Sequence, residues 1–443
     1  MNFFSDDARR IGFFGLGKTN LSLLSLPDIR GREVVLRSDR EIPTDLIPRG
    51  VRIAGIYEGA RAAENIREDM LLFSPSVKRE RPEFLEAEKR GVTLSSDAEM
   101  FFNLARDPIF AVTGSDGKST TTAMTHALLC ERYPSAALCG NIGEAMTPMI
   151  GKADAFAVEL SSFQLTYSNP RVSRGAITNL TENHLDWHGT FSEYKAAKLK
   201  LAESAEEFVL NADDGLLYRR FYGREPAFAV SSRRGISDLS RQIRAKAYYT
   251  LEDGFICRNA RAVVELSKIK RNEPHNLKNL MMAMAMCDGL VSDEWIKKTA
   301  AEFAGLDHRC QTVAVKDGIT YIDSSIDTTP ARTASTLCAL KKQVVIILGG
   351  RGKGLSAEPM LPMLKEYAHA AVVYGESRSD LMSEIGDIVY TKSADSFDEA
   401  VRLASALATD VGAVLLSPAA TSYGDFPDFN ARGNRFKELV SKL

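Results

Sequence analysis

The sequence has no run of about 20 consecutive apolar residues, the length that a helix needs to cross a bilayer. It also has no excess of charge of one sign, because 56 Lys and Arg residues are balanced by 58 Asp and Glu residues, for a formal net charge of -2. We therefore expect no membrane insertion and no dedicated binding of nucleic acid, which usually requires a strongly basic domain. The first residues lack a basic segment followed by an apolar one, so we expect no secretory signal and a cytoplasmic location.

Cysteine and histidine are scarce, with six of each. The cysteines are scattered, and no two are separated by only two residues, so we expect buried thiols in a reducing compartment rather than disulfides or a zinc site. No internal repeat and no low-complexity tract is visible. A chain of 443 residues with 44% hydrophobic content is instead typical of a globular enzyme with two or three domains.

Short apolar runs alternate with amphipathic stretches along most of the chain, which predicts an α/β fold with parallel sheets. Several of these runs end in Gly-rich or Ser-Pro loops, where open α/β sheets bind their ligands. The expected buried strands are Ile11–Gly15, Glu33–Leu36, Met70–Phe73, Ile109–Thr113, Ala155–Leu160, Gly175–Leu180, Phe208–Asn211, Gln343–Leu348, Ala371–Tyr374 and Ala413–Leu416.

Three domains are expected. The first covers residues 1–105. The second covers residues 106–304 and opens at Asp107-Pro108, where proline disfavours continuation of a helix. The third covers residues 305–443 and follows a stretch rich in Met and Ala, Asn276–Leu290, that we expect to be helical.

The strongest local signal is a phosphate-binding loop. The strand Ile109–Thr113 runs into Gly114-Ser-Asp-Gly-Lys-Ser-Thr120 and then into helix-forming sequence. Glycines allow backbone N–H groups to turn toward phosphate oxygens, and the helix directs its positive end at them. Lys118 would reach the outer phosphates, and Ser119 or Thr120 would ligate Mg2+. The loop is two residues shorter than the usual Walker spacing, and a surface turn without ligand is the alternative.

A second glycine turn, Gly15-Leu16-Gly17-Lys18, follows the first expected strand. It could bind a dinucleotide or a nucleotide diphosphate, or it could be a tight connection without ligand. Asn20 stands where a dinucleotide motif has its third glycine, which weighs against NAD.

Two further strands end in residues that suit a metal. Glu159 lies near the end of an apolar strand, where an unpaired carboxylate is costly. Mg2+ near the phosphate loop would compensate this charge, and a salt bridge to a neighbouring Lys or Arg is the alternative. His184 and Asp186 follow the next strand and could bind a metal or an anionic oxygen, or could simply be exposed.

Two helical patterns are ambiguous when taken alone. Lys195 and Lys198 fall on successive turns, which is typical of a solvated basic face. Asn276 and Asn279 share one face of the Met-rich helix near its start. They could bind a ligand or cap the helix, since Asn is a favoured N-cap residue.

The last segment holds two loops with ligand-binding character. Gly349–Gly354 follows a buried strand and carries two cations, which suits a carboxylate or a phosphate. Ser417–Ser422 also follows a strand and is rich in hydroxyl and backbone donors. Either loop could also be only a tight connection.

Taken together, these segments resemble the Mur ligases, the ATP-dependent amide-forming enzymes of peptidoglycan precursor synthesis, over essentially the whole chain. The most similar members are those that add D-glutamate, because of the Glu-Leu-Ser-Ser-Phe-Gln-Leu run, the Tyr-x-Ala-Ala-Lys run and the closing pattern that ends at Arg432-Gly433. The segments that carry the resemblance are Thr113–Thr120, Gly140–Gly143, Glu159–Leu165, Asn179–Asp186, Lys198, His275-Asn276, His308-Arg309, Gly349–Gly354 and Ser417–Phe426.

The resemblance implies an N-terminal Rossmann-like domain that binds UDP, a central P-loop ATPase-type parallel sheet and a C-terminal Rossmann-like domain that binds the amino acid. It implies a monomeric ligase that uses ATP and two Mg2+ ions to add D-glutamate to UDP-N-acetylmuramoyl-L-alanine through an acyl phosphate. Closure of the C-terminal domain would complete the site and exclude water from that intermediate.

The resemblance also implies roles for individual residues, with Lys198 carbamylated. The implied catalytic residues are Lys118, His184 and Lys198. The implied metal ligands are Ser119, Glu159, His184 and Lys198. The implied ATP-binding residues are Gly114, Ser115, Asp116, Gly117, Lys118, Ser119, Thr120, Asn276, Arg309 and Asp323. The UDP-substrate would contact Thr19, Ser38, Asp39, Ser76, Asn141 and His184. The D-glutamate pocket would include Thr328, Lys353, Ser422 and Phe429.

One segment departs from the family pattern. The family's Asp-Ser-Lys-Ala-Thr-Asn corresponds to a stretch within Asp323–Pro330 that has no lysine. Anchored on the first Asp-Ser, the lysine is replaced by Ser325; anchored on the downstream Pro, it is replaced by Ile326. We favour the second alignment, which places Thr328 at the glutamate-contacting threonine and Ser324 at the nucleotide-side aspartate.

The sequence leaves two alternatives open. One is another amino-acid-adding ligase of the same superfamily, such as a folylpolyglutamate synthase, although about 105 residues precede the phosphate loop in this chain and fewer do in the folate enzyme. The other is a non-catalytic module that binds a UDP-sugar and ATP. The intact Lys118, Glu159, His184 and Lys198 weigh against that module, and the missing lysine is the one feature in its favour.

Overall fold

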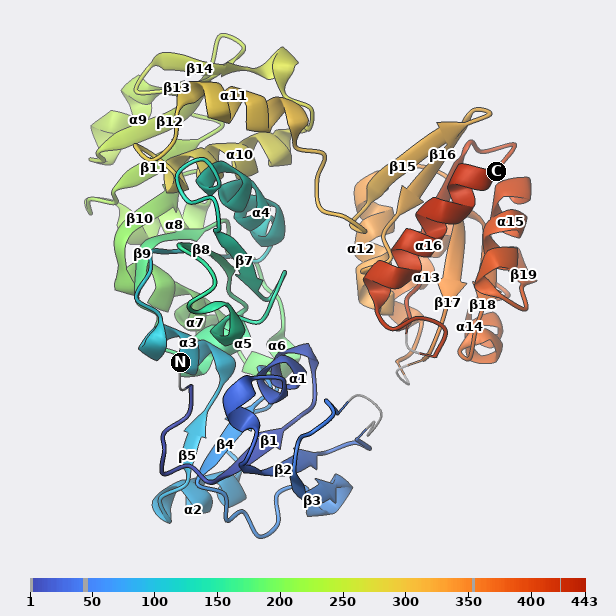
Figure 1. The fold of residues 1–443 in the computed structure, drawn as a ribbon. Coiled ribbons are helices and arrows are strands. Elements are labelled where there is room, and N and C mark those ends of the chain that lie inside the picture. Colours follow the sequence, from blue (N-terminus) through green and yellow to red (C-terminus); the bar gives the residue numbers. More distant parts are fainter. Residues whose placement is uncertain (1–2, 43–46, 353–354, 423) are drawn as a thin grey trace. The chain divides into compact units, whose positions relative to one another are not determined.

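The computed structural model describes residues 3–42, 47–352, 355–422 and 424–443. The chain divides into two compact units, Met1–Phe303 and Ala304–Leu443. The first unit contains two sheets and the second contains one (Figure 1). No helix within the described residues is long and apolar enough to cross a membrane.

The N-terminal sheet has five parallel strands in the order β3-β2-β1-β4-β5. Its strands are β1 Arg10–Phe14, β2 Glu33–Ser38, β3 Ile53–Glu58, β4 Met70–Phe73 and β5 Thr93–Ser95, and its helices are α1 Lys18–Leu24, α2 Pro82–Lys89 and α3 Asp97–Leu104. Successive residues of a strand face opposite sides of the sheet. Accordingly Ile11 and Phe13 pack in one cluster with Leu23 of α1, whereas Phe14 packs with Phe84 of α2.

The second sheet of the first unit has nine strands in the order β14-β13-β12-β11-β10-β9-β6-β8-β7. The strands from β12 to β7 in this order are parallel to one another, whereas β13 is antiparallel to β12 and to β14. The strands are β6 Ile109–Thr113, β7 Ala137–Gly140, β8 Phe156–Glu159, β9 Val172–Ile177, β10 Ala205–Asn211, β11 Phe228–Ser231, β12 Ala247–Glu252, β13 Phe255–Arg258 and β14 Arg261–Glu265. The helices are α4 Lys118–Leu129, α5 Ser162–Tyr167, α6 Leu185–His188, α7 Phe191–Ser204, α8 Gly215–Phe221, α9 Ile236–Gln242, α10 Pro274–Met286 and α11 Asp293–Glu302.

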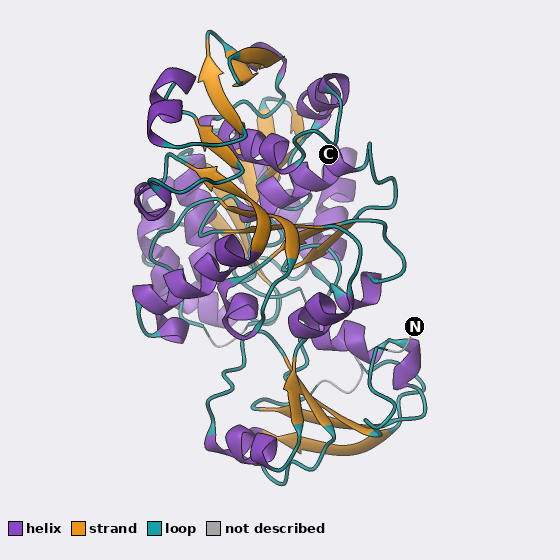
Figure 2. Cartoon of the chain, turned by 90° about the vertical axis from the view of Figure 1, so that its left-hand side faces the viewer, coloured by secondary structure: helices purple, strands orange, loops and turns teal. Residues whose placement is uncertain are grey.

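Helices cover both faces of this sheet (Figure 2). Phe110 and Val112 of β6 pack with Met124 of α4 and the methionines of α10, and Ala111 packs on the other face with Leu201 of α7. A strand that is apolar on both faces is typical of a parallel sheet buried between helices. The polar residues that follow its strands are thereby gathered along one edge of the sheet.

The sheet of the second unit has six strands in the order β15-β16-β20-β17-β18-β19, in which β15 is antiparallel to β16 and the other pairs are parallel. The strands are β15 Gln311–Lys316, β16 Ile319–Asp323, β17 Val344–Gly349, β18 Ala368–Tyr374, β19 Thr391–Ser393 and β20 Ala413–Leu416. The helices are α12 Pro330–Leu340, α13 Leu361–Tyr367, α14 Arg378–Ile385, α15 Phe397–Leu407 and α16 Phe429–Lys442. Val345 packs on the α15 and α16 side, whereas Ile346 packs on the side of α12 to α14.

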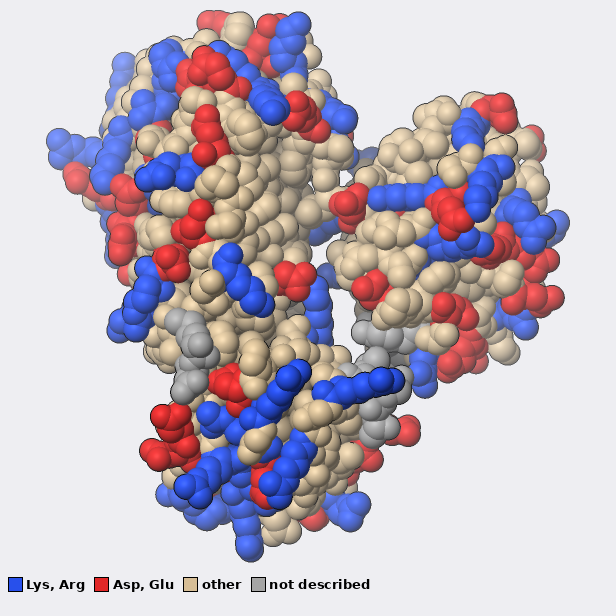
Figure 3. Space-filling model, viewed as in Figure 1, with Lys and Arg blue, Asp and Glu red and all other residues tan. Residues whose placement is uncertain are grey.

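Every strand expected from the sequence overlaps an observed strand, and Met70–Phe73, Ile109–Thr113 and Ala413–Leu416 have the predicted bounds. The overlap is partial for Gly175–Leu180, because β9 ends at Ile177. The Met-rich segment is helical, as α10, although it ends at Met286. Positive and negative side chains are interspersed on the visible face of residues 304–443, in keeping with the balanced charge of the whole chain (Figure 3). A boundary at residue 105 within the first unit stays a proposal.

Candidate active site

The phosphate-loop segment connects β6 to α4 as the sequence predicts. Gly117 has φ 75° and is the residue that precedes the helix. Thr121 is the first residue of α4 whose N–H bonds within the helix, to the carbonyl of Gly117. The N–H groups of Lys118, Ser119 and Thr120 therefore lie ahead of the helix's own hydrogen-bond ladder, where an anion is favoured.

The loop is fixed to the segment that follows β9. Ser115 is buried, and its hydroxyl accepts from the N–H of Thr181 at 2.9 Å and lies 2.8 Å from the hydroxyl of Tyr194. The N–H of Asp116 donates to the side-chain oxygen of Asn179 at 2.9 Å. Lys118 donates to the carbonyl of Ser115 at 2.8 Å. These contacts tie the loop to the segment that follows β9 and to Tyr194 of α7.

Glu159 ends β8 beside this loop and is 1% exposed. One carboxylate oxygen accepts from the side chain of Asn141 at 2.5 Å, whereas the other is buried without a hydrogen-bond partner. The described residues provide no Lys or Arg within salt-bridge distance of it, so the salt-bridge alternative is not observed there. A buried carboxylate oxygen without a partner costs stability, which makes a cation the fitting occupant.

Lys198 of α7 is also 1% exposed, and the interpretation of a solvated basic face is wrong for it. Its amine donates to the hydroxyl of Thr113 at 3.1 Å and lies 4.8 Å from the centre of the Tyr194 ring. Burial lowers the pKa of Lys198 well below its usual value, the charge of Lys118 lowers it further, and Glu159 and Asp116 oppose the change. The environment therefore favours the neutral, nucleophilic amine.

His184 is exposed, with the left-handed φ of 54°, and its ring lies 5.0 Å from that of Phe163. Asp186 is exposed in the following turn. Within the described ranges, no three His, Cys, Asp or Glu side chains form a cluster that could hold a metal. Any cation bound at this loop would need further oxygens, such as those of phosphate.

The start of α10 meets the phosphate loop. A Cβ at Gly117 would lie 2.5 Å from the side-chain oxygen of Asn279, so the loop and the helix are in close contact. Asn279 donates to the side chain of Asn276 at 3.4 Å, and both are buried. The N-cap residue of α10 is Glu273, and Asn276 donates to its carboxylate, so the capping role considered for Asn276 is not observed.

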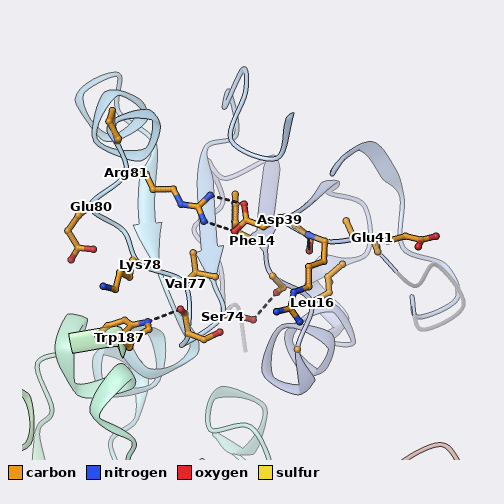
Figure 4. Close-up of a pocket in the computed structure, with 17 residues that line it drawn as sticks. Phe14, Leu16, Asp39, Glu41, Ser74, Val77, Lys78, Glu80, Arg81 and Trp187 are labelled. Atoms are coloured by element: carbon orange, nitrogen blue, oxygen red, sulfur yellow. Dashed lines mark hydrogen bonds and ion pairs between the residues drawn. The ribbon is translucent and has the colours of Figure 1, made fainter. Parts of the chain in front are cut away.

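A cavity of about 990 Å3 opens at the carboxyl ends of β1, β2 and β4 (Figure 4). It is lined by Ser38, Asp39 and Ser76 among the sequence-predicted residues, and by the glycine turn after β1. Thr19, which lies on α1, is not among the described residues that line it. The shape and lining suit a polar ligand of nucleotide size.

Arg81 and Trp187 are among the lining side chains that had no counterpart in the sequence-predicted residues. Arg81 forms a double hydrogen bond with Asp39, which raises the pKa of Arg81, and its guanidinium lies 5.4 Å from the Phe14 ring centre. Trp187 of α6 reaches the cavity from the nine-stranded sheet, and its indole N–H donates to the carbonyl of Ser76 at 2.8 Å (Figure 4). The described lining of the cavity thus comes from the five-stranded sheet and its loops, with Trp187 of α6 added to it.

Matches to known proteins identify the family. A family described as the Mur ligase middle domain matches residues 112–287, and one described as the Mur ligase, glutamate ligase domain, matches residues 308–420. A protein of Ruminiclostridium cellulolyticum named UDP-N-acetylmuramoylalanine–D-glutamate ligase is 32% identical over 403 residues, which cover 85% of this chain and 83% of that protein. A Clostridium beijerinckii protein of the same name is 30% identical and covers 98% and 97%. The chain belongs to the Mur ligase family.

The fold agrees with that membership. The crystal structure of a UDP-N-acetylmuramate-alanine ligase from Thermotoga maritima matches with a TM-score of 0.61 at 20% identity, covering 98% of this chain and 99% of the other. The expected α/β class with three parallel-rich sheets is therefore confirmed for this Mur ligase.

In the second unit of this Mur ligase, Asp323 is fully buried at the end of β16. Its carboxylate lies 2.6 Å from the ring of His308 and accepts from the N–H of Ser325 at 2.9 Å. Arg309 is exposed, next to the buried His308. The structure brings Asp323 together with His308. The sequence assigned no role to His308, which was named only as part of the segment His308-Arg309.

The residues expected around D-glutamate lie on the loops of the same unit. Thr328 is half-buried after β16, Ser422 is buried after β20, and Phe429 begins α16. The backbone carbonyl of Phe429 accepts from the hydroxyl of Ser325 at 2.8 Å, which links two of these loops. Lys353 lies outside the described residues.

Several contacts of the site carried only weak sequence signals in this Mur ligase. Tyr194 stands four positions before Lys198, a spacing that places both on one helix face, and this could have indicated their contact. Asn179 begins the segment Asn179–Asp186 that carries the family resemblance. Asn279 shares a helix face with Asn276. The roles of Arg81 and Trp187 depend on packing between distant segments and had no local signal.

Proposed function

We propose that this chain is the ligase that joins D-glutamate to UDP-N-acetylmuramoyl-L-alanine with conversion of ATP to ADP and phosphate, in peptidoglycan precursor synthesis. The observation that carries the proposal is the near full-length similarity to proteins named for this reaction. The buried Glu159 and Lys198 beside the phosphate loop support a working ligase over a binding module.

The proposed reaction has two steps. The carboxylate of UDP-N-acetylmuramoyl-L-alanine attacks the γ-phosphorus of ATP, which gives an acyl phosphate and ADP. The amine of D-glutamate then attacks the acyl carbon and expels phosphate, which leaves the amide. The first step brings one anion to another and therefore requires concentrated positive charge. Lys118 and the N–H groups that begin α4 supply it in this chain.

Glu159 and Ser119 are the groups that we expect to hold Mg2+ near the phosphates. The unpartnered, buried oxygen of Glu159 fits a hard cation, and Ser119 is buried one residue after the loop lysine. When bound, the ion would neutralise phosphate charge. His184 and Lys198 would serve a second ion, and the exposed position of His184 leaves it accessible to substrate.

We further propose that Lys198 is carbamylated. The side chain is buried, and burial lowers the pKa of its amine and so favours the neutral form that can add CO2. The product would be an anion able to bind metal. Carbon-13 NMR with labelled bicarbonate should give a carbamate signal in the wild type and in Lys195→Arg. A signal that persists in Lys198→Arg would rule out this assignment.

At the substrate end, Ser38, Asp39 and Ser76 would bind the UDP group in the cavity of the five-stranded sheet, with Asn141 contacting the muramoyl part. Thr328, Lys353, Ser422 and Phe429 would bind D-glutamate, and Asn276, Arg309 and Asp323 the ATP. Since ATP and UDP-linked precursors are cytoplasmic metabolites, we propose that the enzyme acts in the cytoplasm, as a monomer with three domains.

The decisive experiment measures release of phosphate from ATP with UDP-N-acetylmuramoyl-L-alanine and Mg2+. D-glutamate, L-glutamate, L-lysine and meso-diaminopimelate are supplied in turn. Release with D-glutamate alone is expected. Release with a different amino acid would assign the chain to another activity of the family. No release with any of them, together with tight binding of ATP, would favour the non-catalytic module.

A further inference from the structure

One buried cation of the second unit has no role in the two reaction steps proposed above. Arg432, in the first turn of α16, is 0% exposed. Among the described residues of this unit, it is the only Lys or Arg that is buried. It belongs to the Arg-Gly pair that closes the sequence pattern.

The guanidinium of Arg432 joins three loops. Its Nε donates to the hydroxyl of Ser325 at 3.0 Å and one terminal nitrogen to the Ser325 carbonyl at 2.9 Å. The other terminal nitrogen donates to the carbonyls of Ala420 at 3.1 Å and Gly349 at 3.4 Å. These acceptors follow or end β16, β20 and β17, three neighbouring strands whose carboxyl ends form the ligand-binding edge of a parallel sheet.

All of these acceptors are neutral. No described carboxylate lies within salt-bridge distance of Arg432, and a guanidinium stays protonated in proteins. A buried charge without a counterion is costly, and in a low-dielectric interior it acts over longer distances than in water. The charge of Arg432 also acts on Tyr374 at the end of β18. Burial raises the pKa of Tyr374, and Arg432 opposes this rise.

The contacts of Arg432 lead directly to the loops proposed for the amino acid. Ser325, which binds it twice, lies in the segment without the family lysine and donates to the backbone of Phe429. Ala420 stands two residues before Ser422. Asp323 is held next to this point, because a Cβ on Gly433 would lie 2.8 Å from its carboxylate oxygen, so the helix turn with Arg432 packs against the end of β16.

We propose that Arg432 is a positioning residue for the acidic amino acid: its guanidinium fork fixes Ser325, Gly349 and Ala420 at the carboxyl ends of β16, β17 and β20. Its charge, which forms no direct ion pair among the described residues, favours an anionic ligand at this edge of the sheet. This inference rests on the proposed function. A fork that reaches three loops is a property of Arg and not of Lys, whose ammonium is a point charge on a flexible stem.

The test compares Arg432→Lys and Arg432→Met with the wild type, by measuring kcat and separate KM values for D-glutamate, ATP and UDP-N-acetylmuramoyl-L-alanine, together with Tm. The matched control is Arg435→Met, one turn along α16, where the side chain makes only surface ion pairs with Asp398 and Glu438. The wild type is assayed first: if it shows no turnover that depends on D-glutamate, the proposed function fails and this inference falls with it.

With D-glutamate turnover established, both Arg432 variants should raise the KM for D-glutamate by about tenfold or more, the equivalent of one lost hydrogen bond to a charged group. The KM values for ATP and UDP-N-acetylmuramoyl-L-alanine should change by less than about twofold, because Arg432 is proposed to act on the binding of D-glutamate alone. A wild-type KM for D-glutamate in Arg432→Lys would overturn the inference. Equal increases in all three KM values would also overturn it and indicate a structural role. If Arg432→Met does not fold, Arg432→Lys alone decides.

Discussion

At the scale of single residues, the site contains polar groups that cost the free protein stability. Glu159 has a buried carboxylate oxygen without a partner, and Lys198 has a buried amine whose pKa burial lowers. The free energy that an unpaired buried carboxylate costs must be offset by other interactions. A ligand that binds only the folded state offsets it by stabilising that state. We therefore propose that these two residues serve a ligand rather than the fold.

The substitution Glu159→Gln tests this argument. It keeps the shape and an oxygen that can accept from Asn141, but removes the charge. We expect phosphate release to fall by about a hundredfold or more. The free energy of unfolding without metal should stay unchanged or rise by about 1 kcal/mol, because an unpaired buried charge has been removed. Activity and chemical denaturation would be measured on the same preparation.

Glu144→Gln is the matched control, since Glu144 is exposed in the neighbouring loop and should keep wild-type activity and stability. A Glu159→Gln protein that is fully active would show that this carboxylate binds no essential cation. A Glu159→Gln protein that is much less stable than the wild type would show that both oxygens of the carboxylate have partners in the folded protein.

How far the sequence predicts a residue depends on what fixes its environment. Glu159 could be recognised because its own strand is apolar, which is a local property. The spacing of the lysines did not identify Lys198, which only the family resemblance indicated, because packing of α7 against β6 is what places its amine at Thr113. The burial of Asp323 against His308 likewise depends on residues 15 positions apart that meet in three dimensions.

At the scale of elements, α3 is tied to the turn after β7 by one buried carboxylate. Asp97 begins α3, is 2% exposed and accepts from the N–H groups of Met146 and Thr147, both at 2.9 Å. Burial raises the pKa of Asp97 above its usual value, although these hydrogen bonds oppose the change. The nearby ionisable group is the thiol of Cys139, whose pKa is raised by burial and then by Asp97.

This arrangement predicts a pH dependence of stability. A raised pKa means that the folded state holds the proton more tightly, so the contribution of Asp97 is largest below its usual value of 3.8 and is lost as pH rises through the raised pKa. Asp97→Ala should lower the free energy of unfolding by about 2–4 kcal/mol, because two backbone donors lose their acceptor. The difference from wild type should shrink as the pH rises above about 3.8, the usual pKa of the side chain.

Denaturant unfolding at a series of pH values measures this difference. Glu88→Ala, at an exposed position of α2, should show the wild-type profile. A gap between wild type and Asp97→Ala that widens with increasing pH would mean that the fold stabilises Asp97 as the anion, and that its hydrogen bonds outweigh the effect of burial.

The strands were predictable to different degrees for a physical reason. Parallel strands that are buried on both faces read as continuous apolar runs, and β4, β6 and β20 have the predicted bounds. The strands β3, β5, β7, β14, β15 and β19, which end the three sheets, were not predicted, because strands paired on one side only are partly exposed. The internal strands β11, β12, β13 and β16 were not predicted either, although β11 is buried throughout. Short, half-exposed strands carry little periodicity, so their existence depends on pairing with a neighbour.

At the scale of the whole molecule, the chain consists of two units with separate hydrophobic cores. Every expected contact of the UDP-substrate lies within Met1–Phe303, and the expected D-glutamate contacts lie within Ala304–Leu443. The length of the chain and the alternation of apolar and amphipathic segments predicted two or three domains. The sequence could not show that Trp187 and Ser76 tie both sheets of the first unit together, because that contact spans 111 residues.

Because each unit has its own core, we expect fragments 1–303 and 304–443 to fold separately, each with a cooperative thermal transition. UDP-N-acetylmuramoyl-L-alanine should raise the Tm of fragment 1–303 and leave that of fragment 304–443 unchanged, since a ligand stabilises only the fragment that binds it. A fragment cut between α7 and β10 is the control and should lack the cooperative transition of fragment 1–303, because the cut divides the nine-stranded sheet. A fragment 1–303 that unfolds without cooperativity, or that ignores the UDP-substrate while the full chain responds to it, would mean that the substrate site needs residues of both units.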